Sequence, residues 1–113
     1  MYMILFVLHD TSLLEDVLNA WEETRVGGVT ILASTGLRRI KHYHGFRDDL
    51  PLMPSLSDIL SHEENLNRTL MTLVPTDEMV DRIVEATTRI TGDLSKPNTG
   101  VLAVLPVARL YGA

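Results

Sequence analysis

The residues best suited to bind a charged ligand lie near the middle of the chain. Arg38, Arg39 and Lys41 are close neighbours in the sequence. Guanidinium and ammonium groups donate hydrogen bonds to phosphate or carboxylate oxygens, so these side chains suit an anionic metabolite. A solvated basic patch that pairs with the nearby Asp48 and Asp49 is an equally good interpretation.

Two histidines follow this basic cluster. His42 and His44 would share one face of an extended segment and could hold a metal ion through their imidazole nitrogens, completed by Asp48 or His62. On spacing alone, a solvated polar loop is the favoured interpretation. His42 and His44 therefore stay weak candidates for a metal site.

The sequence lacks the patterns of the common catalytic sites. It contains no cysteine, which excludes thiol nucleophiles, zinc fingers and iron–sulfur clusters. It has no nucleophile–base motif and no phosphate-binding glycine motif of the GxxxxGK[ST] type. The net charge of −5 argues against a general nucleic-acid binder. We expect a protein that is not an enzyme.

The length and the apolar runs indicate what must position these residues. A chain of 113 residues fits a single domain. Its longest apolar run, Met1 to Leu8, is too short to span a membrane and lacks the positive leader of a signal peptide. We expect a cytoplasmic protein without membrane insertion.

Apolar strands and amphipathic helices alternate along the chain. Apolar runs predict four strands, at Tyr2–Leu8, Val29–Ser34, Thr69–Val74 and Val101–Leu105. Helical spacing predicts one helix with a stripe at Leu14, Val17, Leu18 and Trp21, ended by Gly27-Gly28, and a second with a stripe at Met79, Ile83, Ala86 and Ile90, ended by Gly92. The order strand–helix–strand, repeated twice, predicts an α+β, ferredoxin-like βαββαβ sandwich with an antiparallel four-stranded sheet and two helices on one face.

The first and last predicted strands are apolar on both faces. Two helices can cover only one face of the sheet, so the other would be a large exposed apolar surface. We expect a second copy of the chain to cover it. The long connection at about 37–67, with a short helix predicted at Ser55–Leu60, is of a length typical of functional or mobile segments.

Several strings resemble the nitrogen regulatory protein P-II family. They cover roughly two-thirds of the chain, and the Thr-Gly and Pro-Val-Ala-Arg strings are the most specific. The matching strings are Leu14–Val17, Gly28–Thr30, Thr69–Val74, Val80–Ala86, Thr91-Gly92 and Val101–Arg109.

This resemblance implies a homotrimer with an adenine-nucleotide site in the cleft between subunits. The site would be built from a T-loop after the second strand, here the 37–67 segment, and a B-loop after the second helix, from Gly92 to Gly100. The chain would then be a single P-II-like domain, 1–113. The residues expected at the ligand are Thr30, Gly36, Arg38, Arg39, Thr91, Gly92, Lys96, Gly100 and Arg109.

The chain also departs from the family pattern. The B-loop is longer, Val101 stands at the position of the closing lysine, Arg38 replaces a glycine, and the C-terminal arginine pair is missing. We therefore expect a small anionic metabolite, with an adenine nucleotide among the candidates, and regulation of a transporter or enzyme through the 37–67 segment. The alternatives are a CutA-like trimeric metal-binding protein and a small ferredoxin-like enzyme.

Overall fold

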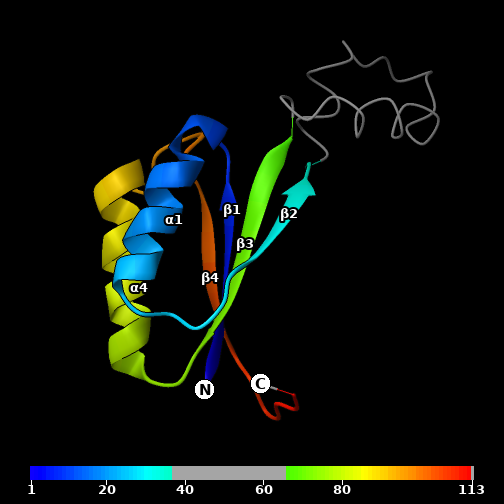
Figure 1. Cartoon of the computed structure of the whole chain (residues 1–113). Coiled ribbons are helices and arrows are strands. Elements are labelled where there is room, and N and C mark those ends of the chain that lie inside the picture. Colours follow the sequence, from blue (N-terminus) through cyan, green and yellow to red (C-terminus); the bar gives the residue numbers. More distant parts are fainter. Residues whose placement is uncertain (37–65, 113) are drawn as a thin grey trace, which may run out of the picture.

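The computed structural model describes residues 1–36 and 66–112. The described chain forms one antiparallel sheet in the order β2-β3-β1-β4. The strands are β1 (Tyr2–Leu8), β2 (Thr30–Ser34), β3 (Asn67–Val74) and β4 (Gly100–Pro106); the helices are the short 3-10 turn η1 (Thr11–Leu13), α1 (Leu14–Glu23) and α4 (Asp77–Thr91). Both α1 and α4 cover the same face of the sheet (Figure 1). This arrangement confirms the predicted α+β, ferredoxin-like sandwich.

Local hydrogen bonds explain where the helices begin. The Asp10 carboxylate accepts a hydrogen bond from the backbone N–H of Ser12 at 3.1 Å and so caps η1. The Thr76 hydroxyl accepts one from the backbone N–H of Met79 at 3.2 Å and caps α4. Each side chain satisfies a backbone donor that the first helical turn leaves without a partner.

The end of α1 differs from the prediction. The helix ends at Glu23 and not at Gly27-Gly28, so that boundary is wrong. The Thr24 hydroxyl donates to the Trp21 carbonyl at 2.5 Å, and Arg25 takes a left-handed conformation with φ 68°. A polar side chain and a strained arginine thus end the helix before the glycines are reached. Gly92 does end α4, with φ 81°, as predicted.

The core lies between the sheet and the two helices. Ile4, Phe6 and Leu8 of β1 are fully buried there, which places every second residue of this strand on the helix-covered face. Trp21 of α1 is also fully buried, and its ring centroid lies 6.3 Å from that of Phe6. The remaining buried apolar residues are Val17, Ala20, Leu66, Leu70, Val74, Ile83 and Ala86.

Among the residues that the structure describes, no helix covers the other face of the sheet, which is mostly apolar (Figure 1). Strand register places the alternate residues of all four strands on this open face. In the described chain the exposed fractions reach 58% for Val101, 48% for Leu32, 39% for Leu105 and 37% for Leu73. The apolar members of the open face are Met3, Leu5, Val7, Leu32, Met71, Leu73, Val101, Ala103 and Leu105.

The register also defines the two ends of the sheet. Leu8 lies opposite both Gly100 and Arg68, and we call this the Gly100 end. Tyr2 lies opposite Pro106 and Val74 at the Tyr2 end. Within residues 1–36 and 66–112, no helix is long and apolar enough to cross a membrane. The predicted helix at Ser55–Leu60 lies outside the described residues.

Candidate functional site

The Gly100 end holds most of the predicted ligand residues that the structure describes. Gly36 follows β2 there, and the B-loop between α4 and β4 starts at Thr91-Gly92 and closes at Gly100. These two segments lie on opposite edges of the sheet, because β3 and β1 separate β2 from β4. Three strand spacings correspond to roughly 14 Å. One copy therefore brings them to the same end but not into contact.

A buried hydroxyl without a partner lies next to Gly36. In the described part of the chain, the side-chain oxygen of Thr35 is buried and forms no hydrogen bond. Its neighbour Ser34 is bonded, with its hydroxyl 2.7 Å from that of Thr69. Buried hydroxyls nearly always have a partner in folded proteins. Thr35 thus offers a hydrogen-bonding group to a ligand or water at this end of the sheet.

The B-loop is held together by its own hydrogen bonds. The Asp93 carboxylate accepts from the Ser95 backbone N–H at 2.9 Å and from the Ser95 hydroxyl at 2.8 Å. These two bonds lower the pKa of the Asp93 carboxyl below its usual range, since both favour the charged form. Further along, the Thr99 hydroxyl donates to the Lys96 carbonyl at 2.8 Å. Asp93 therefore acts as a turn residue, and the exposed Lys96 side chain stays available at the loop surface.

The close of the B-loop requires glycine at position 100. Gly100 has φ +141°, and a Cβ atom built there would lie 2.5 Å from the Val7 carbonyl oxygen and 2.9 Å from the Phe6 ring. Only glycine lets the start of β4 approach β1 this closely. The predicted site residue Gly100 thus has a structural role that does not depend on a ligand.

Thr30 and Arg109 lie away from the other predicted site residues. Thr30 begins β2 and lines an apolar hollow of about 680 Å³ with Met3, Met71 and Leu110. Arg109 is exposed and follows β4 beyond the Tyr2 end. The length of β4, roughly 20 Å, separates this end from Gly100. A single copy does not bring Thr30 and Arg109 to the B-loop.

The other predicted ligand residues are not described. Arg38, Arg39, His42 and His44 lie outside the described residues. Within the described ranges, no group of three His, Asp or Glu side chains is placed to hold a metal ion.

Arg68 is a basic residue at the Gly100 end that sequence reasoning missed. It lies opposite Leu8 in the register, is half-buried, and donates to the Asn67 carbonyl at 3.3 Å. Its signal was a single basic residue at the start of an apolar strand. Such a residue is common at strand ends, so the signal is visible only once the strand register is known.

Comparison with known proteins assigns no family. The chain matches no protein-family model, and a search of curated proteins finds no relative.

Proposed function

We propose that this protein is a P-II-like regulatory protein that assembles as a homotrimer. The observation that carries the proposal is the open face of the sheet. On β1 and β4 all of its members are apolar, and β2 and β3 carry both apolar and polar members, whereas the helices already bury the other face. Apolar area removed from water contributes about 25 cal/mol per Å², so a second copy of the same surface is a favourable cover.

The proposed ligand is a small anionic metabolite bound between neighbouring subunits. In this proposal Arg38 and Arg39 of one subunit and the loop from Gly92 to Gly100 of its neighbour contribute to one cleft. Two features support it: both segments leave the sheet at the Gly100 end, and Thr35 offers an unpaired hydroxyl there. Arg68 is a further cation at this end.

The proposed action is regulation without catalysis. The ligand would bias the conformation of the 37–67 segment, which would then meet a cytoplasmic face of a transporter or a cytoplasmic enzyme. Such an effect requires only that the ligand bind one conformation more tightly than another. An adenine nucleotide is one candidate ligand, and the missing closing lysine favours a smaller anion than ATP.

Isothermal titration of the purified protein with ATP, ADP, AMP and bicarbonate tests the ligand. Arg39→Ala should weaken the binding of the anion that the wild type prefers by about 1–3 kcal/mol, because it removes a charge-assisted hydrogen bond. A parallel titration with divalent metal ions tests the metal-binding alternative. Metal binding that needs His42 and His44, with no anion binding, would overturn the proposal.

A further inference from the structure

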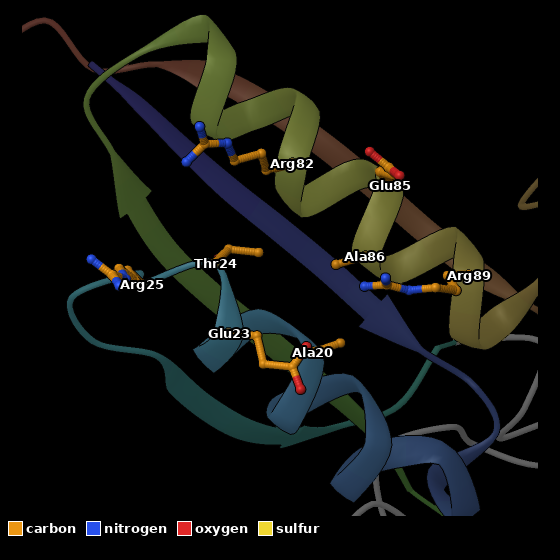
Figure 2. A pocket seen from close by; sticks show the side chains of 8 residues that line it. All are labelled: Ala20, Glu23, Thr24, Arg25, Arg82, Glu85, Ala86 and Arg89. Carbon is orange, nitrogen blue, oxygen red and sulfur yellow. The ribbon is translucent and has the colours of Figure 1, made fainter.

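An open groove between α1 and α4 is lined by half of the arginine and lysine side chains that the structure describes. Arg25, Arg82 and Arg89 line it, while the described chain outside it carries Arg68, Lys96 and Arg109. The groove has a volume of about 340 Å³ and lies on the outer side of the helix layer (Figure 2). It is thus separate from the open face of the sheet.

Two arginines of the groove lie on either side of a small apolar surface, which we call the floor of the groove. Arg82, Ala86 and Arg89 fall at i, i+4 and i+7 of α4 and share one side of the helix. Seven residues of helix correspond to roughly 10 Å between the two arginine Cα atoms. Ala86 and, from α1, Ala20 form the floor between them (Figure 2). Their small side chains leave the space that larger residues would fill.

The guanidinium groups in the groove are not neutralised. In the part of the chain that the structure describes, none of the three forms an ion pair; the one hydrogen bond is from Arg82 to the Met79 sulfur at 4.0 Å. Glu23 and Glu85 also line the groove, and the Glu85 carboxylate points away from α1 (Figure 2). The lining thus carries three guanidinium groups against two carboxylates, so its net charge is positive on a protein whose net charge is −5.

Arg25 provides a second, independent observation. It occupies the position just after the C-cap of α1 with φ 68°, and its backbone N–H donates to the Glu22 carbonyl at 2.9 Å. Glycine is the favoured residue in this conformation, and two glycines stand only a few residues later. A strained arginine at the mouth of an arginine-lined groove is the kind of local cost that binding sites retain.

We propose that this groove binds an elongated dianion, a small molecule with two acidic groups joined by a short organic linker. Each acidic group would accept hydrogen bonds from one of the separated guanidinium groups of Arg82 and Arg89, for which planar oxyanions are well matched. The linker would lie on the alanine floor, and Arg25 would add charge at the open end. Dicarboxylates and bisphosphates share this chemistry.

Methyl NMR of the protein with labelled alanine tests the proposal, with dicarboxylates and a bisphosphate as the titrated ligands. The probes are succinate, glutarate, adipate and fructose 1,6-bisphosphate, with acetate and inorganic phosphate at equal ionic strength as controls. The Ala20 and Ala86 methyl resonances should move, whereas those of Ala33 and Ala103 in the sheet should not. We expect either that a dicarboxylate binds at least about tenfold more tightly than acetate, or that fructose 1,6-bisphosphate binds at least about tenfold more tightly than inorganic phosphate. Such a difference is typical of one added charge-assisted contact.

Four variants test whether the dianion binds in this groove. Arg82→Gln and Arg89→Gln should each weaken binding by about tenfold or more. Arg109→Gln removes the same charge beyond the Tyr2 end of the sheet, outside the groove, and should leave the affinity within about twofold, as expected for a screened distant charge. Arg25→Gly should weaken binding while raising the melting temperature, a combination that a merely structural residue would not give.

Three results would overturn the proposal. The first is that no probe moves the Ala20 and Ala86 resonances. The second is that acetate binds as tightly as the dianions. The third is that Arg82→Gln and Arg89→Gln bind as tightly as the wild type.

Discussion

At the scale of single residues, one buried hydrogen-bonded pair joins the two helices. The Trp21 indole N–H donates to the Thr87 hydroxyl at 2.8 Å, and that hydroxyl donates to the Ile83 carbonyl at 2.7 Å. Trp21 and Thr87 are both fully buried. The helical stripe in the sequence predicts Trp21 as core, but the polar partner on α4 becomes visible only with the packing of the helices.

Thr87→Val should destabilise the protein by about 1–3 kcal/mol, because it keeps the shape and leaves the buried indole N–H without an acceptor. Urea unfolding followed by the fluorescence of this single tryptophan measures the change. Thr88→Val is the matched control: its less buried hydroxyl donates only to the backbone of its own helix, at 3.1 Å to the Val84 carbonyl. The control should stay within about 0.5 kcal/mol of the wild type. Equal losses in both variants would contradict this account of the pair.

The Asp93 turn makes the B-loop sensitive to acid. Its pKa is lowered in the folded protein, so its contribution is fully present above the unfolded pKa and is lost as the pH falls through the folded one. A carboxyl NMR titration should give a midpoint for Asp93 below its ordinary value of 3.8. Ser95→Ala should reverse only part of the lowering of the Asp93 pKa, because the hydrogen bond from the Ser95 backbone N–H is the larger cause and remains in the variant. A wild-type midpoint at or above the ordinary value would contradict the turn.

At the scale of elements, the close approach of β4 to β1 depends on Gly100. Gly100→Ala should destabilise the protein by about 2–3 kcal/mol, since the new methyl would meet backbone as well as the Phe6 ring. Gly27→Ala, where a Cβ meets nothing within 4 Å, is the control and should stay within about 0.5 kcal/mol. Thermal or urea unfolding of both variants measures the difference. A Gly100→Ala protein as stable as Gly27→Ala would contradict the tight approach.

The sequence predicted the elements well where an apolar pattern extends over many residues. It failed where single side chains determine the end of a helix. β1 begins and ends as the apolar run predicts, and β3 starts only two residues before the predicted Thr69. The end of α1 was missed because a threonine hydroxyl and a left-handed arginine end the helix, neither of which is a usual stop signal.

The candidate site was less predictable than the fold. Spacing along the chain does not reveal that Thr30 and Arg109 lie toward the Tyr2 end while Gly36 and the B-loop lie at the Gly100 end. That separation follows from the strand register, which sequence patterns do not fix. Likewise, helical spacing shows that Arg82 and Arg89 share a side of α4, but only the packing of α1 brings Arg25 to the same groove.

At the scale of the whole molecule, the two faces of the sheet differ, because the helices bury one face and leave the other open. The continuous apolar runs predict that the first and last strands are apolar on both faces. The structure assigns each residue to its face: Phe6 is fully buried under the helices, whereas Leu5 and Leu73 lie on the open face. A charge at Phe6 should therefore prevent folding. A charge at Leu73, which is 37% exposed, should leave the fold intact and act on assembly alone.

The most direct test of the proposed homotrimer is native mass spectrometry of the wild type, Leu73→Asp and Ile31→Asp. Ile31 is 45% exposed but points to the helix-covered side of the edge strand, so Ile31→Asp adds the same charge away from the open face. We predict a trimer for the wild type and for Ile31→Asp, and folded monomers for Leu73→Asp. A monomeric wild type, or a Leu73→Asp protein that stays trimeric, would contradict the account.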